Sequence, residues 1–316
     1  MRSYCLSNTL INSSEPLLLI KEIPYVVKPD ICLKWHTGLS ISSVSNIFAK
    51  FNCDSEIVAE SSFNDVIPRA KITKNEKMIL YNTQVLFSLK HNITASDTVD
   101  VEVYICDGFP IDLAKEVLLT DALPLAIFMK FHRFFIHATC ISIDGKHIAF
   151  FGDSGAGKST LATFMYYNGY DVLSDDMICI SVENGIVSTT SFINYLRLWE
   201  DSYKFFNDIQ ANATTYGGKH IIKMKEKCNG WVKVDACFWL NRGCSKTEIK
   251  ALTALNGYIR LISSIIMGFA YENKEFGLIC QAFKSFVKVC PLFMLNYPND
   301  YSRLYELLPM LKEAIA

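Results

Sequence analysis

The stretch that decides the fold is "HIAFFGDSGAGKSTLATFMYYNGYDVLSDD", residues 147–176. An apolar strand pattern runs into a glycine-rich loop, a helical pattern follows, and a second apolar strand ends at two adjacent aspartates. The loop matches the phosphate-binding template Gly-x-x-x-x-Gly-Lys-Ser from Gly152 to Ser159, in the strand–loop–helix context that this template requires. The sequence therefore predicts an α/β fold with a nucleotide site at one edge of its sheet.

Each residue type in this loop has a physical task. Glycines let backbone N–H groups converge on phosphate oxygens, and the positive end of the following helix dipole favours anions. Lys158 neutralises the β- and γ-phosphates, and the Ser159 hydroxyl can ligand Mg²⁺, so ATP and Mg²⁺ are the expected cofactors. The predicted nucleotide-binding residues are Gly152, Asp153, Ser154, Gly155, Ala156, Gly157, Lys158, Ser159 and Thr160.

Asp175 and Asp176 close the strand after the helix, at the same edge of the sheet as the loop. A single aspartate at this position usually holds Mg²⁺. Adjacent side chains at a strand end diverge, so one carboxylate can stay on the metal while the other acts as a base beside the γ-phosphate. The alternative for an Asp-Asp pair is a turn or a helix cap.

Three further polar residues are candidates on weaker grounds. His137 lies in an apolar strand ahead of the loop strand, where a lone histidine is more often a core residue. Arg197 in "LRLW" and Lys219 in "GGKHIIKMK" are either surface charges or cations that hold phosphate or an acidic acceptor. Spacing alone does not choose between these interpretations.

Composition narrows the class of protein. The chain has 316 residues, 50% of them hydrophobic, and a net charge of −1, which predicts a folded protein without a basic field for nucleic acid. Its 11 cysteines form no CxxC pair and no Cys/His cluster, which favours reduced, buried thiols in a cytoplasmic protein. No stretch supplies the roughly 20 apolar residues of a membrane span. We therefore expect neither nucleic acid nor a membrane as a partner.

The pattern along the chain predicts two domains. Residues 1–105 read mostly as short strands separated by Asn, Asp, Ser and Gly. Residues 110–133 turn to helical spacing, with a break or kink at Pro124. We expect a β-rich N-terminal domain, 1–108, that binds the acceptor or mediates assembly, followed by a phosphate-binding α/β domain, 109–316.

The core motif resembles a known family. Residues 136–180, "IHATCISIDGKHIAFFGDSGAGKSTLATFMYYNGYDVLSDDMICI", are similar to the catalytic domain of HPr serine kinases. In that domain a His-Ala strand, an Asp-Gly hairpin, a GDSGxGKS loop, a short helix and an Asp-Asp strand end occur in this order. The resemblance implies a P-loop-containing, HPr-kinase/PEP-carboxykinase-like fold for residues 109–316. The Arg-Gly-Leu-Gly segment of HPr kinases has no counterpart here.

Over nearly its full length the chain looks more like the HPr-kinase-related proteins found beside lasso-peptide biosynthesis genes. The similar segments are "YCLSNTLINSSEPLLLI" (4–20), "INYLRLWEDS" (193–202) and "GGKHIIKMK" (217–225), the last ahead of "DACFWL". Members of that group phosphorylate the C-terminal serine of a lasso precursor peptide. The resemblance thus implies a peptide or protein acceptor with a serine hydroxyl. HPr kinases assemble as oligomers, so it also implies a homo-oligomer.

The same resemblance implies a role for each candidate residue. Ser159 and Asp176 would hold Mg²⁺, and Asp175 would be the general base that takes the proton of the acceptor hydroxyl. His137 would lie near the γ-phosphate, and Lys158 on the β- and γ-phosphates. Second-tier contacts to phosphate or acceptor would come from Arg197 and Lys219.

Three functions stay open from the sequence. The leading one is a kinase that transfers the ATP γ-phosphoryl group to a serine hydroxyl. The second is a kinase of a small hydroxyl compound, such as free serine, or of another protein. The third is a nucleotide-sensing, motor-type or non-catalytic P-loop module. The adjacent aspartates and the lack of a guanine-specifying Asn-Lys-x-Asp motif favour a kinase.

Overall fold

A computed structural model describes residues 1–316 apart from 18–19, 54–55, 60–67, 95, 207–209, 216 and 226–229. The chain divides into two units. The first contains Met1–Phe134 and Ile266–Gly277, and the second contains Phe135–Ile265 and Leu278–Ala316. Residues 18–19 of the opening motif at 4–20 lie outside the described residues.

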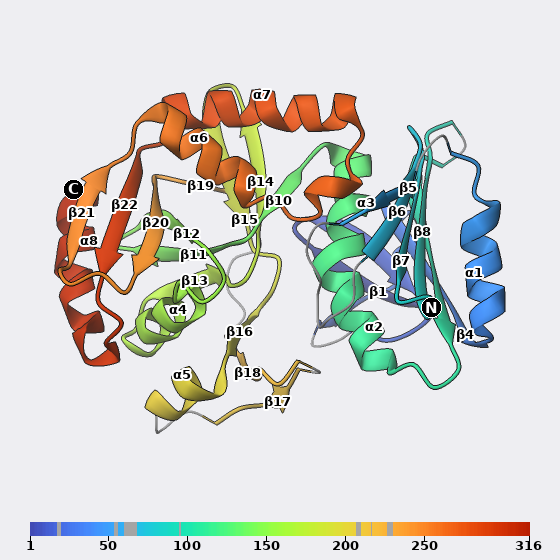
Figure 1. The fold of residues 1–316 in the computed structure, drawn as a ribbon, viewed down its shortest axis with the longest axis horizontal. Helices are drawn as coiled ribbons and strands as arrows, with labels where there is room; N and C mark the ends of the chain where they lie inside the picture. The colour runs from blue at the N-terminus through green and yellow to red at the C-terminus, as the bar shows by residue number, and fades with distance from the viewer. Residues whose placement is uncertain are drawn as a thin grey trace. The chain divides into compact units, whose positions relative to one another are not determined.

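The first unit is built on one nine-stranded sheet with the order β3-β1-β2-β4-β9-β8-β7-β6-β5 (Figure 1). β4 pairs in parallel with β2 and β9, whereas β8 and β7 continue the sheet antiparallel. The strand pattern predicted for residues 1–105 corresponds to this sheet. Its strands are β1 (Arg2–Leu6), β2 (Thr9–Ser13), β3 (Glu22–Ile23), β4 (Ile31–Leu39), β5 (Glu56–Val58), β6 (Pro68–Ile72), β7 (Glu76–Tyr81), β8 (Val85–Asn92) and β9 (Thr98–Cys106).

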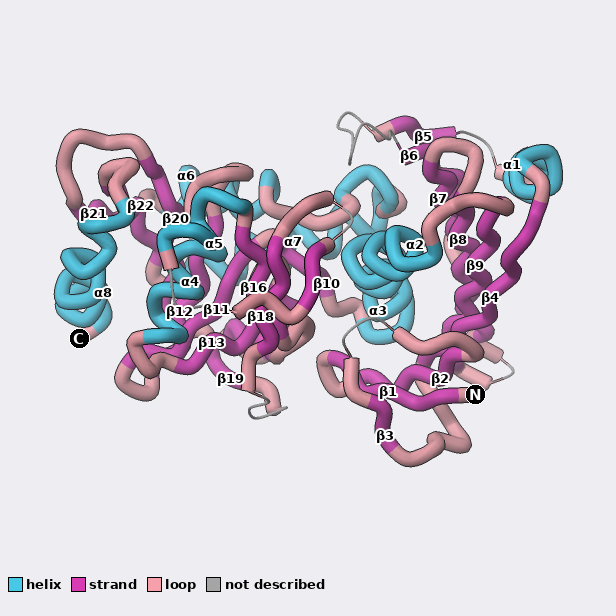
Figure 2. The backbone as a smooth tube through the Cα atoms, turned by 90° about the horizontal axis from the view of Figure 1, so that it is seen from below, coloured by secondary structure: helices cyan, strands magenta, loops and turns pink. Residues whose placement is uncertain are grey.

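Helix α1 (Ile41–Lys50) interrupts the strands, which the sequence pattern did not predict. Ser40 caps its N-terminus by accepting a hydrogen bond from the Ser43 backbone N–H. Val44 and Phe48, four residues apart, are buried against one face of the sheet. Figures 1 and 2 show α1 on this face and helices α2 and α3 on the other.

A π-helical turn joins the two helices on that other face. This turn, η1 (Leu118–Ala122), lies between α2 (Ile111–Val117) and α3 (Leu123–Phe131). The sequence predicts a break or kink at Pro124, because proline lacks an N–H and crowds the carbonyl four residues earlier. The π turn directly before Pro124 accommodates both effects.

The boundary between the units falls at residue 134 rather than at the predicted residue 108. Most side chains from Leu113 to Met129 are buried, and α3 packs on β8 and β9. A helical segment that is apolar on all sides is stable only when it is covered, so these helices extend the first unit. The segment predicted to open the second domain therefore belongs with the sheet before it.

A distant segment, Ile266–Gly277, completes the first unit. Lys77 on β7 is fully buried, and its Nζ donates to the Ala270 carbonyl at 2.9 Å and to Glu275 Oε2 at 2.6 Å. A buried ammonium without partners is costly, so these two bonds hold the segment to the sheet. The second unit is consequently interrupted in sequence, unlike the continuous domain 109–316 that was predicted.

The second unit is built on a six-stranded mixed sheet with the order β13-β11-β12-β20-β22-β21 (Figure 1). β12, β20 and β22 are parallel neighbours, while β11 and β21 run antiparallel to them. This is a mixed α/β architecture. Its strands are β11 (Ala138–Ile143), β12 (Lys146–Phe151), β13 (Asp171–Ser174), β20 (Ala236–Arg242), β21 (Glu248–Ala251) and β22 (Leu292–Tyr297).

Two smaller sheets, β10-β14-β15-β19 and β16-β18-β17, complete the strands. The Asp144-Gly145 turn joins β11 to β12 with positive φ at both residues, as a tight hairpin requires. The hairpin signal in the core motif is therefore confirmed. The strands of the smaller sheets are β10 (Phe134–Ile136), β14 (Ile178–Glu183), β15 (Ile186–Thr190), β16 (Tyr195–Leu198), β17 (Ala213–Thr214), β18 (His220–Lys223) and β19 (Val232–Lys233).

Helices cover both faces of the six-stranded sheet. Along β22 the side chains alternate, so Leu295 and Tyr297 join the core beneath α4 and α8, whereas Leu292 lies against Gly257 of α6. This layering leaves the strand ends open at one edge. The helices of this unit are α4 (Lys158–Tyr167), α5 (Glu200–Phe205), α6 (Ala254–Ser263), η3 (Tyr301–Glu306), α8 (Leu307–Ile315) and, from Leu278 onward, α7 (Asn273–Val289), whose first residues belong to the first unit.

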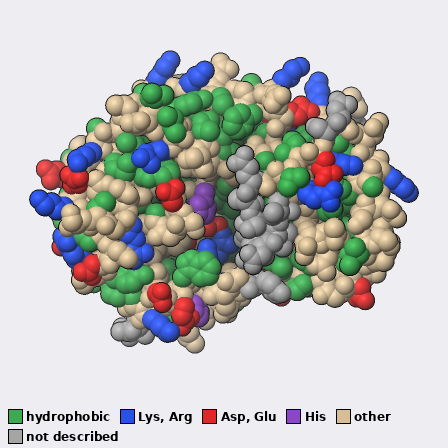
Figure 3. Space-filling model, in the orientation of Figure 1, with side chains coloured by type: hydrophobic (Ala, Val, Ile, Leu, Met, Phe, Trp, Pro, Cys, Tyr) green, Lys and Arg blue, Asp and Glu red, His purple; other side chains and the backbone are tan. Residues whose placement is uncertain are grey.

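Hydrophobic side chains gather on the surface over α6 and α7, where Leu255, Ile259 and Leu278 are exposed (Figure 3). Across the described ranges no helix is both long and apolar enough to span a membrane. The ten cysteines that the structure describes are free thiols, and five of them are buried.

Candidate functional site

The predicted phosphate loop joins β12 to α4 and depends on its glycines. The backbone has positive φ at Gly155 (+80°) and Gly157 (+91°), a region that other side chains avoid. The buried Tyr297 lies close to the loop, and its hydroxyl donates to the Ala156 carbonyl. A Cβ atom on Gly157 would overlap that hydroxyl. Gly157 is thus required both by the backbone and by its neighbour.

Lys158 is buried at the start of α4. Its Nζ donates to the Gly152 carbonyl at 2.7 Å and to the Asp153 carbonyl at 3.1 Å. Burial lowers the pKa of Lys158 to about 8, against the opposing effect of Asp175 and with a smaller lowering from Lys219. An ammonium held by carbonyls and close to a second cation is well placed to receive an anion.

Asp175 follows β13 and is fully buried with its carboxylate against the loop helix. One oxygen, Oδ1, accepts from Ser159 Oγ at 3.1 Å and also from the Thr139 hydroxyl. The other, Oδ2, accepts from the backbone N–H of Arg197 at 3.2 Å. β11 separates β13 from β12 and is antiparallel to both, so the two outer strands end at the same edge, as the sequence predicts.

Asp176 points elsewhere, because its backbone is left-handed with φ +70°, an uncommon conformation for aspartate. Its Oδ2 forms an ion pair with the Arg197 guanidinium, and its Oδ1 lies 3.7 Å from His137 Nδ1. The predicted roles gave the metal to Asp176 and the base to Asp175. The structure places Asp175 against the Ser159 hydroxyl and Asp176 in the pocket lining.

His137 lies directly before β11, and its backbone N–H donates to the Ser264 carbonyl at 2.7 Å. The imidazole is 41% exposed and is not a core side chain, so the core interpretation is wrong. Partial burial, followed by the cations Lys158, Arg197 and Lys219, lowers the pKa of His137 well below its ordinary value. The ring is therefore neutral at pH 7 in the free protein.

Lys158, Asp176 and His137 line a pocket of about 80 Å³. The pairing of β16 with β18 sets Leu198 opposite His220, which brings Arg197 and Lys219 to the same rim. Lys219 Nζ lies 4.9 Å from the centre of the Trp199 ring. The lining residues are His137, Ser154, Gly155, Gly157, Lys158, Ser159, Thr160, Asp176, Arg197, Leu198, Trp199, Ser202, Lys219 and Arg242.

Three predicted nucleotide-binding residues do not line the pocket. Gly152 and Asp153 use their carbonyls to hold Lys158, and the Ala156 side chain packs into the core below the loop. The other predicted loop residues line the pocket, and so do Arg197 and Lys219, which the sequence left open between surface charges and site residues. Asp175 stays behind the pocket.

Four lining residues were not predicted. Arg242 ends β20, the parallel neighbour of the loop strand, so its position at the carboxyl edge of the sheet could have indicated it. Leu198 and Trp199 follow Arg197 directly in "LRLW". Ser202 has no signal in the sequence; its hydroxyl lies 2.9 Å from Thr160 Oγ1.

The Ser159 hydroxyl and the Asp175 carboxylate suit Mg²⁺. This ion prefers hard oxygen ligands and binds through one or two carboxylates together with substrate phosphates. Among the residues that the structure describes, no group of three or more His, Cys, Asp or Glu side chains could hold a metal ion. The Ser159 hydroxyl contacts Asp175 rather than Asp176, the residue predicted to hold Mg²⁺ with it.

Comparisons with known proteins add little. No protein-family model and no curated protein matches the sequence. Among solved structures, the Hpr(Ser) kinase/phosphatase from Coxiella burnetii is similar to this chain with 12% sequence identity and a TM-score of 0.30. The aligned region covers 57% of this chain and 95% of that chain. At this TM-score the likeness carries no functional conclusion, which must come from the site itself.

Proposed function

We propose that the protein is an ATP-dependent, Mg²⁺-requiring phosphotransferase that moves the γ-phosphoryl group to a serine hydroxyl. The observation that carries this proposal is the separation of the two adjacent aspartates. Asp175 is buried on the loop serine, whereas Asp176 lines the pocket beside Arg197. A nucleotide switch needs one carboxylate for the metal. A second carboxylate in the pocket supplies a base for an acceptor.

The residues divide the work of transfer as follows. Lys158 binds the β- and γ-phosphates, and the acceptor hydroxyl gives its proton to Asp176. Arg197, paired with Asp176 in the free site, gains a second anionic partner when the γ-phosphate enters and stabilises the charge of the transferred group. Mg²⁺ held by Ser159 and Asp175 would neutralise part of the phosphate charge. His137, neutral in this setting, can donate or accept a hydrogen bond beside Asp176.

For the acceptor we propose a peptide, with the C-terminal serine of a lasso precursor peptide as the first candidate. The support is the resemblance of the segments around Arg197 and Lys219 to the lasso-cluster proteins. Among the described lining residues, the cations Lys158, Arg197, Lys219 and Arg242 accompany one carboxylate, that of Asp176. A serine whose own carboxylate is free suits such a site. Cytoplasmic location, homo-oligomer formation and a role of the first unit in acceptor binding or assembly stay predictions.

The test is direct transfer. The protein is incubated with Mg-ATP and a peptide that ends in serine, with the same peptide ending in alanine and with free serine as controls. Mass spectrometry should find one added phosphate on the serine peptide only. Rapid hydrolysis of ATP that no acceptor accelerates would instead favour a switch or motor ATPase. Phosphate on free serine would move the acceptor to the small-molecule alternative.

The two aspartates give opposite signatures. Asp176→Asn should slow transfer by about 10²–10⁴-fold and change Mg-ATP affinity by no more than a few-fold. Asp175→Asn should weaken binding of Mg-ATP more than binding of ATP in the presence of EDTA, because the metal contact is lost in addition to a hydrogen bond that the buried carboxylate accepts. Normal turnover in Asp176→Asn would contradict the assignment of the base.

A further inference from the structure

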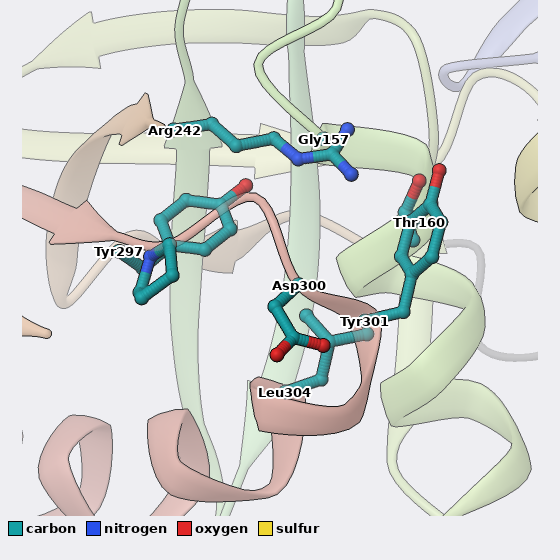
Figure 4. A pocket seen from close by; sticks show the side chains of 8 residues that line it. Gly157, Thr160, Arg242, Tyr297, Asp300, Tyr301 and Leu304 are labelled. Carbon is teal, nitrogen blue, oxygen red and sulfur yellow. The ribbon is translucent and has the colours of Figure 1, made fainter. Parts of the chain in front are cut away.

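A second hollow adjoins the phosphate pocket and shares Gly157, Thr160 and Arg242 with it. Its other walls come from the end of β22 and from η3. The enclosed part is small, about 10 Å³, and the hollow opens to the surface past the exposed Asp300. The lining residues are Gly157, Thr160, Arg242, Tyr297, Pro298, Asp300, Tyr301 and Leu304 (Figure 4).

The position of this hollow fits the nucleoside end of a bound nucleotide. A triphosphate is a linear chain, and the residues that serve its γ end, Asp176, Arg197 and His137, all line the first pocket. None of these three lines the second hollow. The hollow instead begins at Thr160, the residue after the Gly-Lys-Ser motif. A nucleotide with its γ-phosphate beside Asp176 therefore continues past Thr160 into this space.

The hollow contains a flat platform. Arg242 extends across it towards Tyr301, with Thr160 beside the ring (Figure 4). The Arg242 Cζ atom lies 4.9 Å from the centre of the Tyr301 ring. A guanidinium backed by an aromatic ring offers its open face to a nucleobase, which stacks on such planes whatever its sequence identity. Both residues are half-buried, so the platform is held in place but can be reached from solvent.

Hydrogen bonds fix the platform relative to the phosphate loop. The Tyr301 hydroxyl lies 3.2 Å from Ser202 Oγ, which in turn lies 2.9 Å from Thr160 Oγ1. The chain of hydroxyls therefore connects the ring to the first turn of the loop helix. A base stacked here keeps a constant spacing from the phosphates.

Asp300 can distinguish adenine from guanine by hydrogen bonding. Its Oδ1 accepts both the backbone N–H of Ser302 at 2.9 Å and the Ser302 hydroxyl at 2.7 Å, which leaves Oδ2 to contact a ligand. One oxygen matches the single exocyclic amino group of adenine, and the guanine O6 atom would face the carboxylate with like partial charge.

We propose that this hollow is the nucleobase subsite, with Arg242 and Tyr301 stacking the base and Asp300 selecting adenine over guanine. The inference rests on the proposed function, since it requires a nucleotide on the loop. It goes further by assigning base selection to the residues that end β20 and begin η3.

Titration calorimetry with ATP, GTP and inorganic tripolyphosphate, each with Mg²⁺, tests the subsite. The unmodified protein should bind ATP at least about fivefold more tightly than tripolyphosphate, the lower end of the stacking contribution. Tyr301→Leu should remove most of that difference without changing tripolyphosphate binding. Tyr305→Leu, on the same helix η3 but outside the hollow, is the matched control and should keep the difference.

Asp300→Ser tests base selection. The serine hydroxyl can still cap η3, so the variant keeps the fold of the segment while it removes the second oxygen. ATP affinity should fall towards GTP affinity, with tripolyphosphate unchanged. Equal affinities for ATP and GTP in the unmodified protein would overturn the selection of adenine. Equal affinities for ATP and tripolyphosphate would overturn the subsite.

Lys158→Ala separates failure of the subsite from failure of the proposed function. If the loop is the phosphate site, this variant loses binding of all three ligands. Suppose that Lys158→Ala loses binding of all three ligands and that the unmodified protein binds ATP and tripolyphosphate equally. These two results together overturn the nucleobase subsite but leave the phosphate loop intact. Unchanged binding of all three in Lys158→Ala overturns the phosphate loop, and the subsite with it.

Discussion

Replacing Gly157 with alanine should destabilise the protein more than the same change at Gly155. Both glycines have left-handed backbone, which costs about 1–2 kcal/mol for a residue with a Cβ. At Gly155 the new Cβ meets nothing within 4 Å, so strain is the whole effect. At Gly157 the Cβ overlaps the buried Tyr297 hydroxyl, and overpacking adds about 1–3 kcal/mol. The difference between the two variants should therefore be about 1–3 kcal/mol.

Urea unfolding followed by circular dichroism measures that difference, and tripolyphosphate binding gives a second readout. Tyr297→Phe removes the overlapping oxygen, and the next atoms near the Gly157 Cβ, including Tyr297 Cζ, are 3.6 Å away in ordinary contact. Tyr297→Phe should thus restore much of the stability lost in Gly157→Ala when the two are combined, after correction for its own effect. Equal destabilisation by Gly155→Ala and Gly157→Ala, or no rescue in the double variant, would refute the reasoning.

Other predictions concern charged groups. Glu275→Ala leaves the ammonium of Lys77 buried without its carboxylate and should cost about 3–5 kcal/mol in thermal or urea unfolding, whereas Glu76→Ala, which removes the exposed pair with Lys90, should cost less than about 1 kcal/mol. The pKa of Lys158 is lowered to about 8 in the free protein. Below pH 8 the amine is already protonated, whereas above pH 8 it must take up a proton before it can bind phosphate. Affinity for tripolyphosphate, measured by calorimetry, should be constant up to about pH 8 and fall by up to tenfold per pH unit above; constant affinity to pH 9.5 would contradict this. The same lowered pKa means that the unfolded chain binds more protons between pH 8 and 10.5, so the contribution of Lys158 to stability rises with pH across that window.

Local patterns predicted the loop, its helix and the hairpin before it, because each depends on residues close in sequence. The backbone has positive φ at Asp144, Gly145 and Gly157, and glycine and aspartate are residue types that adopt this conformation readily. The meeting of the loop with the Asp175 strand follows from the direction of neighbouring strands. These features position most of the residues of the candidate site.

Local sequence patterns could not predict which of Asp175 and Asp176 contacts Ser159 and which lines the pocket. Which carboxylate turns to Ser159 depends on the left-handed backbone at Asp176, and either residue could have adopted it. Arg242 reaches the pocket because β20 pairs directly with the loop strand, a neighbour relation between segments almost 90 residues apart. The sequence holds no periodic signal for such pairing.

The boundary between the units was missed for a related reason. Helical spacing after residue 110 suggested the start of a new domain. The position of the boundary depends instead on which sheet covers the apolar side chains of these helices. The return of residues 266–277 to the first unit includes two hydrogen bonds from Lys77, a buried lysine in an ordinary strand pattern, and packing such as Tyr271 against Phe128. Lysine is normally taken as an exposed residue.

That returning segment has a consequence for how the chain is made. Lys77 leaves the ribosome 198 residues before its partner Glu275, so the first unit cannot close until Glu275 has been synthesised. The second unit has most of its strands translated in the interval, and its segment Leu278–Ala316 follows after residues 266–277 have emerged. During synthesis from the N-terminus, the first unit therefore cannot complete its fold before most of the second unit has been made. Separate expression of residues 1–134 should yield an incomplete unit with an orphaned cation, which added peptide 266–277 could complete.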